Sequence, residues 1–466
     1  MRRGLGDIRT APVPPGPSGM NVLRYWAQML WDPLATYGVL RRTYGDTVRV
    51  PLSRNRSFFL LDRPEYAEHV LLKHQDQYVR TFIARPLKAF LGDGLLTAEG
   101  AVWQRHRRLV QPVFSHRHMQ SFAPTIVDAA RKRFAQWVPG TRIDIAVEMR
   151  ALTMDVIGRA LFGMDLSSDA AMVGRAETRL QSSMALRAAA IHLAFLSPER
   201  IRAVATRIAP ALGEASQTLN SLVARIIDAR IRAPHDEPSD LLDLLLAAGQ
   251  DEQPLSRAEI QDEVMTLVLT GHETTTHALT FTLALLSRNP AAYERMIAEV
   301  DDVLAGRDPQ ATDVDSLPWT QAVVNEALRL YPPGCYIIRD AAEDDHISGV
   351  QVFAGDTIAL SPYLLHRIPE FWPDPERFDP RRFLPNSAST YPRYAYLPFG
   401  AGRRICLGAS LAFLEMTLVL AVFAQSVVVD AVQTGPLRVR GDVTLHPVQP
   451  VVVTVAPAHS RQHTTR

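Results

Sequence analysis

The sequence predicts a mainly helical protein of the α+β class, with small β-sheets to one side of a helical body. Apolar residues recur at helical spacing through most of residues 99–331, whereas alternating β-type patterns gather near both ends of the chain. The longest uninterrupted helical pattern runs from Ser256 to Ser287 and would be about 48 Å long. Since a chain of this length has an expected radius of gyration of about 23 Å, that helix must cross the whole molecule.

The composition is that of a globular protein with ample material for a core. Of the 466 residues, 47% are hydrophobic and 21% are charged, which excludes disordered and collagen-like proteins. No internal segment is long or polar enough to act as a linker. We therefore expect a single catalytic domain over residues 20–456, between flexible tails at 1–19 and 457–466.

The charge and the cysteines limit the compartment and the partners. A net charge of +1 gives no reason to expect nucleic acid as a partner. Two cysteines, Cys335 and Cys406, exclude a disulfide scaffold and favour a reducing compartment. The start of the chain has no apolar signal-type segment, and Glu415 interrupts the most apolar stretch, 409–429. We expect a cytoplasmic monomer without a membrane span.

Local signals near the N-terminus predict two helices around a hairpin. Asp32-Pro33 opens a helix that ends at Gly45, and the alternating segments 46–52 and 56–62 form the hairpin. Asp62, followed by Pro64, is expected to cap a second helix that runs to about His74.

The rest of the chain is predicted to be largely helical. A capping box of Ser256 and Glu259 opens the long helix, and Pro290 follows its end. Further elements are expected in the order in which their patterns occur: helices over 99–113, 118–137, 143–163, much of 170–233 and 319–331, then short strands, a Pro-rich meander over 369–385, a Gly-rich loop and a helix over 409–425.

The Gly-rich loop, FGAGRRICLG over 399–408, is the most informative segment. A lone cysteine is usually a small buried hydrophobe. Here Gly400 and Gly402 permit a tight loop, and Cys406 stands just before a helix, whose dipole favours a thiolate. Arg404 adds a positive charge, and Gly408 leaves room for a flat ligand. These features favour Cys406 as an axial ligand of haem iron.

This loop resembles the haem-binding signature of the cytochrome P450 superfamily, FGxGxRxCxG, position for position. The resemblance implies that Cys406 is the proximal thiolate and metal ligand, that Phe399 shields its sulfur, and that Arg404 pairs with a haem propionate. Gly400 and Gly408 shape the cradle. No C-x-x-C-H run occurs, so the resemblance implies haem b without covalent attachment.

Two further motifs resemble structural and cofactor-binding parts of this family. Glu326 and Arg329 form an ExxR pair, whose ordinary interpretation is a surface ion pair; with Arg377 they resemble a buried triad that braces the cysteine loop. Trp103 and Arg107, spaced four residues apart, could be a packed Trp and a solvated Arg. Their resemblance to the family's WxxxR implies that they bind a haem propionate. Arg339 resembles the family's second propionate-binding arginine.

The long helix carries TGHETT over 270–275, which resembles the family's oxygen-activation motif. The resemblance implies that Gly271 makes room for O2, that Thr274 donates a hydrogen bond to it, and that Glu273 relays protons. Thr270 departs from the usual Ala or Gly. His272 is expected to be a filler rather than a ligand.

The resemblance implies an O2-dependent monooxygenase that inserts one oxygen atom into a small molecule, by hydroxylation or epoxidation. Electrons must come from a separate ferredoxin or flavodoxin with its reductase, for which Arg105, Arg108 and Arg403 could form a docking face, although surface arginines are ordinarily just solvated. Rival interpretations are a peroxygenase or isomerase with the same fold, and a haem sensor or electron carrier with His272 as sixth ligand.

The segments expected to line the substrate pocket carry few charges, which implies a lipophilic substrate such as a terpenoid, fatty acyl chain, steroid or polyketide. A role in secondary metabolism fits such substrates. Cys335 is expected to be an apolar wall residue. The expected pocket side chains are Phe82, Ile83, Leu87, Leu95, Leu96, Leu267, Tyr336 and Ile337.

Overall fold

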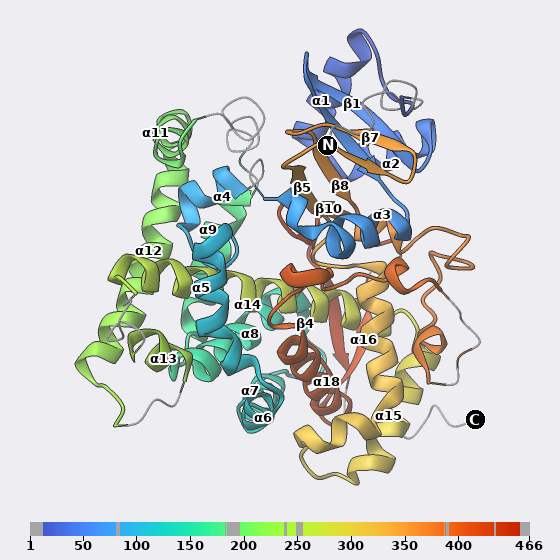
Figure 1. Ribbon diagram of the computed structural model, residues 1–466. Helices are drawn as coiled ribbons and strands as arrows, with labels where there is room; N and C mark the ends of the chain where they lie inside the picture. Colours follow the sequence, from blue (N-terminus) through green and yellow to red (C-terminus); the bar gives the residue numbers. More distant parts are fainter. Residues whose placement is uncertain are drawn as a thin grey trace.

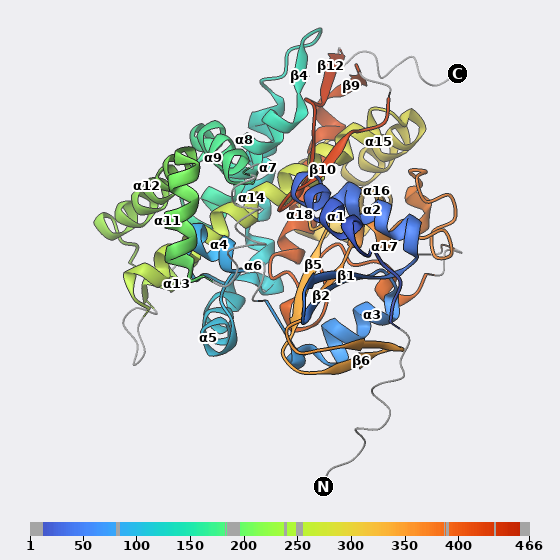
Figure 2. The same ribbon diagram turned by 90° about the horizontal axis from the view of Figure 1, so that it is seen from above.

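A helical body and a smaller β-rich region make up the molecule (Figure 1). The computed structural model describes residues 13–80, 84–181, 183, 196–236, 240–247, 255–385, 387, 391–432 and 435–456. In both views the helices α9 and α11–α13 lie on one side and the strands β1, β2 and β5 on the other (Figure 2). This arrangement confirms the predicted fold class.

The helices within the described residues follow the predicted order. They are α1 (Met20–Trp31), α2 (Pro33–Tyr44), α3 (Pro64–Glu68), α4 (Ala84–Leu91), α5 (Gly100–Val110), α6 (His116–Ser121), α7 (Ala123–Phe134), α8 (Ile145–Phe162), α9 (Ala170–Gln181), α11 (Pro198–Ile208), α12 (Pro210–Arg232), α13 (Leu241–Ala247), α14 (Arg257–Leu286), α15 (Pro290–Leu304), α16 (Pro318–Leu330), α17 (Pro362–Leu365) and α18 (Ala409–Ser426).

Helix α14 is the central helix, as its length predicted. It has 30 residues, and Ser256 and Glu259 form the expected capping box at its start. Its side chains are buried almost throughout its second half, because α8, α12, α16 and α18 all pack against it. The helix has a weak amphipathic pattern for that reason: water reaches little of any face.

Within the described residues, the strands form four small sheets. The largest has the order β1-β2-β8-β5-β3, and its β2–β8 pair is parallel, with Phe58 opposite Thr357. It therefore joins the N-terminal hairpin to a segment about 300 residues later, seen as blue beside orange in Figure 1. The strands are β1 (Thr47–Ser53), β2 (Arg56–Leu61), β3 (Tyr78–Val79), β4 (Arg142–Asp144), β5 (Ile337–Ala341), β6 (Asp345–Ile347), β7 (Val350–Val352), β8 (Thr357–Leu360), β9 (Val428–Ala431), β10 (Val439–Gly441), β11 (Leu445–Pro447) and β12 (Val452–Ala456).

Near the N-terminus, helix α2 and the β1–β2 hairpin form as predicted, but the residue predicted to cap helix α3 does not cap it. Asp32 accepts a hydrogen bond from the backbone N–H of Ala35 at 3.0 Å and opens α2, and β1 and β2 form the predicted hairpin. Asp62, however, does not cap α3, whose N-cap residue is Arg63. The buried Asp62 carboxylate accepts a hydrogen bond from the backbone N–H of Ser361 instead, so it ties the hairpin to the strand β8 region.

The predicted tail over residues 1–19 is shorter than expected. The carbonyl of Pro15 accepts a hydrogen bond from the Arg49 N–H at 3.0 Å, and a Cβ on Gly16 would lie 1.8 Å from the Arg49 carbonyl oxygen. Residues 15 and 16 are therefore docked along the edge of β1. Residues 1–12 and 457–466 of the predicted tails lie outside the described residues.

Helix α18 is a core helix. By length and hydropathy alone it could cross a membrane, so Glu415 does not exclude this as we expected. However, 61% of the helix is buried inside the protein, where it packs against α7, α15 and α16. Its apolar composition is accounted for by this burial.

Candidate active site

A cavity of about 360 Å³ lies between helix α14 and the cysteine loop, residues 398–408. Most of the residues that the sequence analysis selected meet here, although they come from five separate parts of the chain. The described residues that line it include Arg80, Leu95, Leu96, Trp103, Arg107, Ile157, Leu267, Thr270, Gly271, Thr274, Tyr336, Ile337, Arg339, Phe399, Gly400, Arg404, Cys406, Gly408 and Glu415.

The cysteine loop has the tight geometry that its glycines predicted. Gly400 and Gly402 both have φ of 72°, a left-handed conformation that favours glycine. A Cβ on Gly402 would lie 1.8 Å from the Leu71 carbonyl oxygen, so the loop can approach that segment closely only with glycine there. The N–H of Cys406 donates to the Phe399 carbonyl at 3.0 Å and closes the loop.

The Cys406 thiol faces the cavity, which accounts for its exposure. Protein atoms surround it on the other sides, and this burial raises the pKa of Cys406 above its ordinary value, although the Gly408 N–H and the Arg107 charge act in the opposite direction. The expected influences, an N–H at the helix start and a nearby arginine, are thus present and favour the thiolate, whereas burial favours the thiol. A bound metal ion must displace the proton, and the nearby charge is Arg107 rather than Arg404.

Arginine side chains gather at one end of the cavity, and we call Arg80, Arg339 and Arg404 the arginine cluster. Arg404 forms an ion pair with Glu99 at 2.7 Å. Arg339 is 8% exposed and donates to the Ile338 carbonyl. Burial, together with repulsion from Arg80 and Arg404, lowers the pKa of Arg339 to about 9. Burial likewise lowers the pKa of Arg404 to about 10 and that of Arg80 below its usual range.

Arg80 was not among the residues predicted from the sequence. It stands alone in its segment, without a motif, and only folding brings it to the other two arginines. Three cations share the single carboxylate of Glu99, so among the described residues the cluster has an excess of positive charge inside the protein. Burying such charge is costly unless an anion compensates it. The cluster is therefore suited to bind a ligand with carboxylate groups.

Trp103 and Arg107 both border the cavity from helix α5, as their spacing predicted. Arg107 donates to the Ile405 carbonyl at 3.0 Å, and its guanidinium lies 5.8 Å from the centre of the Trp103 ring. Arg404 lies closer to the same ring, at 4.1 Å. The indole therefore packs beside two cations at the entrance to the arginine cluster.

Glu326 and Arg329 form a fully buried pair on α16, with distances of 2.7 and 2.8 Å between their polar atoms. The predicted third member is wrong: the Arg377 side chain is exposed, and only its backbone carbonyl accepts a bond from Arg329. Arg382 takes that place, 3.5 Å from the Glu326 carboxylate. Arg377 and Arg382 stand in two similar Pro-x-Arg-Phe segments, and sequence reasoning chose the wrong one.

His366 connects this pair to the cysteine loop, and nothing in the sequence pointed to it. Its Nδ1 donates to the Arg329 carbonyl at 3.1 Å, and its Nε2 accepts from the Leu397 N–H at 2.8 Å. Complete burial lowers the pKa of His366 to about 3, which keeps the ring neutral. This neutral ring fixes the chain directly before the loop.

On α14, Thr270, Gly271 and Thr274 line the cavity. Thr274 donates to the Thr270 carbonyl at 2.9 Å, so its hydroxyl is held along the helix. A Cβ on Gly271 would lie 2.7 Å from Ile157 Cδ1. The missing side chain at Gly271 thus permits the close crossing of α8 and α14, in addition to leaving space at the cavity.

Glu273 is not among the described residues that line the cavity. Its carboxylate contacts Gln181 and accepts a hydrogen bond from Thr444 at 3.0 Å, with His277 Nε2 at 3.4 Å. Although burial raises the pKa of Glu273, hydrogen bonding and the charge of His277 outweigh it and bring the pKa to about 2. Glu273 is therefore ionised at neutral pH.

His272 is a buried filler, as expected. Its Nδ1 lies 2.7 Å from the Val268 carbonyl, and its Nε2 is 3.4 Å from Glu177 on α9. The ring does not line the cavity, so this chain's His272 does not reach the place of a sixth iron ligand.

Glu415 is a second residue that the sequence analysis missed as part of the site. It lies on α18, borders the cavity and is 2% exposed, and its Oε1 has no hydrogen-bond partner among the described residues. Burial raises the pKa of Glu415 to about 8, so the carboxyl is largely protonated at neutral pH. The sequence analysis considered it only as an interruption of an apolar stretch.

Five of the eight expected pocket residues line the cavity: Leu95, Leu96, Leu267, Tyr336 and Ile337. Leu87 is not among the described lining residues, and Phe82 and Ile83 lie outside the described part of the chain. Cys335 is also not a lining residue. It is buried in an apolar cluster with Leu34, Phe281 and Leu445, and burial raises the pKa of its thiol, which makes it unreactive.

The expected docking arginines are mostly engaged. Arg105 contacts Glu259, and Arg403 contacts Asp76, while Arg108 is exposed. Of the three, Arg108 offers the most accessible charge.

The residues present fit an iron porphyrin with two carboxylate groups. Cys406 offers a sulfur ligand, Gly408 leaves the surface beside it open, and the arginine cluster supplies positive charge for the carboxylates. This donor set is one that binds haem iron through a thiolate.

Comparisons with known proteins agree with this geometry. The family model described as Cytochrome P450 matches residues 14–449. Cyclooctatin synthase from Streptomyces melanosporofaciens is 35% identical over 411 residues, 88% of this chain and 88% of the relative. Cyclooctat-9-en-7-ol 5-monooxygenase from the same organism is 34% identical and covers 82% of each chain. The crystal structure of the cytochrome P450DA heme domain superposes with a TM-score of 0.80 at 26% identity, over 96% of this chain and 97% of that one.

Proposed function

Since the chain belongs to the cytochrome P450 family and is a haem-thiolate monooxygenase, we propose that it hydroxylates or epoxidises a lipophilic small molecule with electrons from a separate ferredoxin or flavodoxin and its reductase. The observation that carries the substrate class is the distribution of charge in the cavity. Its arginines meet at one end and beside the cysteine loop, whereas Leu95, Leu96, Leu267, Tyr336 and Ile337 form much of the remaining wall.

An apolar wall of this kind selects by shape and by exclusion of water rather than by ion pairing. The threonine hydroxyls of α14 are the main polar groups that it presents near the reacting region. The name of one relative, cyclooctat-9-en-7-ol 5-monooxygenase, denotes a substrate with one double bond and one hydroxyl group. A ring or chain hydrocarbon with few polar groups, as found in secondary metabolism, is the substrate class that this cavity fits.

When bound, haem supplies the activation of O2 and the transfer of one oxygen atom to the substrate. Cys406 would hold the iron, and Phe399 would shield the sulfur from water. Arg80, Arg339 and Arg404 would hold the propionates, together with Trp103 and Arg107 at the same edge. The neutral His366 and the Glu326–Arg329 pair keep the loop in place from behind.

Proton delivery is assigned to Thr274 and Glu273. Thr274 lines the cavity, and its hydroxyl, now bonded to the Thr270 carbonyl, can turn into the cavity to donate a hydrogen bond there. Glu273 is the adjacent residue, and its present partners hold it as the carboxylate, so it can accept and pass on a proton only after it leaves them. Because Gln181 and Thr444 hold the carboxylate away from the cavity, delivery requires it to change partners.

We assign the supply of electrons to a redox partner that docks on the domain over 20–456. Arg108 is the residue we assign to the docking face. We propose a cytoplasmic monomer; the two unpaired cysteines fit a reducing compartment, and the burial of α18 in the core fits a helix that does not cross a membrane. The position of His272 argues against an electron carrier with two axial ligands.

The experiment is a measurement of coupling in Thr274→Ala. The protein is supplied with a ferredoxin, its reductase and a converted substrate, and the product formed per electron pair consumed is compared with wild type. We expect coupling to fall by more than about tenfold while substrate binding persists. Thr280→Ala is the matched control, because Thr280 lies on the same helix but is buried against the Thr276 carbonyl.

Unchanged coupling in Thr274→Ala would remove the proton-delivery assignment. Turnover with hydrogen peroxide but none with electron donors would instead support the peroxygenase alternative.

A further inference from the structure

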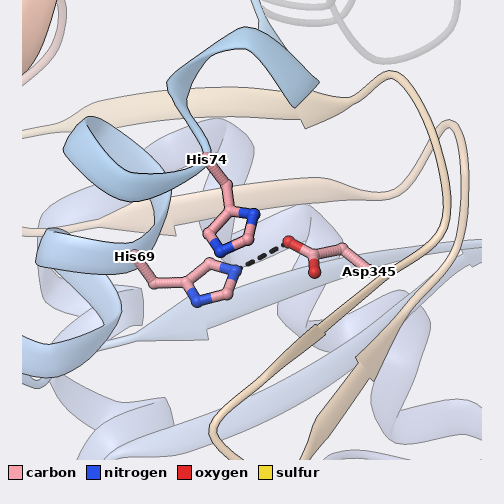
Figure 3. A group of neighbouring side chains, drawn as sticks. All are labelled: His69, His74 and Asp345. Carbon is pink, nitrogen blue, oxygen red and sulfur yellow. Dashed lines mark hydrogen bonds and ion pairs between the residues drawn. The ribbon is translucent and has the colours of Figure 1, made fainter.

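Two histidines and an aspartate lie together outside the haem cavity: His69, His74 and Asp345 (Figure 3). Each offers a ligand atom, and these atoms all lie within 4.8 Å of one another. The side chains of His69 and Asp345 are partly buried, with exposed fractions of 15% and 12%. We propose that this cluster is a binding site for a divalent transition-metal ion, of which Zn²⁺ is the best match.

The backbone brings the two imidazoles together. Residues His69–Lys73 form a π-helical turn, and the His74 N–H donates to the His69 carbonyl at 2.9 Å. A five-residue turn places its first residue and the residue after its last one directly above each other. The rings therefore stack, with centres 4.0 Å apart and planes 12° from parallel. Asp345, the first residue of β6, reaches their edge from another part of the chain (Figure 3).

The hydrogen bonds made by His74 and Asp345 leave lone pairs that face the centre of the cluster available to a metal ion. Gln77 Oε1 accepts from His74 Nδ1 at 3.2 Å, which leaves His74 Nε2 as the atom with a lone pair. The Tyr78 hydroxyl donates to Asp345 Oδ2 at 2.5 Å and the His346 N–H donates to Oδ1 at 2.7 Å, so the remaining lone pair of Oδ2, on the side of His69, is the one for the metal. Metal-binding histidines and carboxylates characteristically have such outer hydrogen bonds, which fix tautomer and direction.

His69 and Asp345 already share a proton where the metal would bind. His69 Nε2 lies 2.7 Å from Asp345 Oδ2. A metal ion can take the position between them when the neutral His69 ring carries its proton on Nδ1 instead of Nε2. No other group then has to lose a proton. Because the lone pairs lie in the planes of nearly parallel rings, binding must also turn at least one ring until the lone pairs meet.

The choice of metal follows from the donors. Two imidazoles and one carboxylate suit Zn²⁺, whereas Mg²⁺ and Ca²⁺ prefer oxygen ligands. Three protein ligands would leave a position for water. A second group among the described residues, His235, Asp240 and Asp243, lacks this potential, because Arg230 donates to both carboxylates and repels a cation.

The site connects the segment packed behind the cysteine loop to the β6–β7 hairpin. The segment that carries His69 and His74 also holds the cysteine loop: Gln75 Oε1 accepts from the Arg403 N–H at 2.8 Å, and the Leu71 carbonyl lies against Gly402. Asp345 belongs to the β6–β7 hairpin. A bound ion would tie this hairpin to the segment beneath the loop and would stabilise the folded protein by its binding free energy.

The test is a calorimetric titration with ZnCl₂ of the haem-loaded full-length protein, after removal of metals with a chelator. We expect one Zn²⁺ per chain and a rise in melting temperature on binding. His74→Ala should weaken binding by more than about 100-fold, and Gln77→Leu, which removes only an outer partner, by about 10–100-fold. His346→Ala is the matched control, because this neighbouring histidine is exposed and contributes only its backbone N–H to the site.

Absence of saturable Zn²⁺ binding to the wild-type protein would overturn the proposal, and so would equal binding by wild type and His74→Ala. Haem content and the CO spectrum are recorded for each variant. Since the metal site lies outside the haem cavity, these spectra test the monooxygenase assignment separately from the Zn²⁺ titration.

Discussion

Two groups of buried charges support the cysteine loop, and they differ in how completely they are paired. Arg329 donates five hydrogen bonds, two to Glu326 and the others to the carbonyls of His366, Pro375 and Arg377. In the arginine cluster, by contrast, three arginines share Glu99. A fully paired network is complete within the protein and stabilises the fold. An unbalanced one lacks a partner that a ligand can supply.

The largest effect is expected where the pairing is complete. Arg329→Ala leaves the Glu326 carboxylate buried without its main partner, which should cost about 3–5 kcal/mol of folding free energy. Because the loop loses its brace, haem should be lost as well. Urea unfolding and haem content measure the two effects. A variant that unfolds like wild type and retains haem would show that the pair is not the brace.

In the arginine cluster we expect a substitution to weaken haem binding without lowering the stability of the haem-free protein. Arg339→Met should weaken haem binding about 10–100-fold, the range for loss of a charge-assisted hydrogen bond. The haem-free protein should be at least as stable as wild type, since a buried, repelled charge is removed. Haem-transfer titrations and thermal unfolding of the haem-free protein test this. Equal destabilisation of the haem-free protein by Arg339→Met and Arg329→Ala would remove the distinction between the two groups.

Glu415, a buried ionisable side chain that borders the same cavity, should make the stability of the protein depend on pH. Because the pKa is raised from about 4.5 to about 8 by burial, the folded state binds more protons than the unfolded state between these values. The free energy of unfolding should therefore decrease as pH rises through this window, so the protein becomes less stable, and it should level off above it. Glu415→Gln should flatten the slope by up to about 1.36 kcal/mol per pH unit. Urea unfolding of the haem-free protein at several pH values measures it; identical slopes would contradict the assignment.

The smallest effect separates the two candidate partners of Glu326. Arg382→Ala should cost about 1–2 kcal/mol, since Arg382 lies 3.5 Å from the buried carboxylate and donates to the Asp374 carbonyl. Arg377→Ala is the matched control, and its exposed side chain should matter by less than about 0.5 kcal/mol. Chemical unfolding of both variants decides it, and a reversed order would restore the triad expected from the sequence.

The features that could be predicted are those encoded within a few residues. The capping box of α14, the hairpin 46–61 and the cysteine loop all depend on neighbours in sequence, and the structure confirms them. The errors involve partners far along the chain. Asp62 bonds to Ser361 instead of capping α3, and the partner of Glu326 is Arg382 rather than Arg377.

The same reasoning explains the residues that were missed. Arg80 enters the arginine cluster from a segment more than 250 residues before Arg339, and His366 touches both Arg329 and Leu397 only after folding. Gly271 was assigned to oxygen access from its motif, while its contact with Ile157 depends on how α8 crosses α14. Such contacts have no local pattern, since packing between distant elements determines them.

The most direct test of the account is the carbon monoxide difference spectrum of the reduced protein, for wild type and Cys406→Ala. Wild type should show the red-shifted Soret band of a thiolate-ligated haem, and Cys406→Ala, folded and supplied with haem, should not. Cys335→Ala is the control, because its buried thiol is away from the cavity. A thiolate-type band retained by Cys406→Ala, or absent from well-folded wild type, would contradict the assignment of Cys406 as the iron ligand.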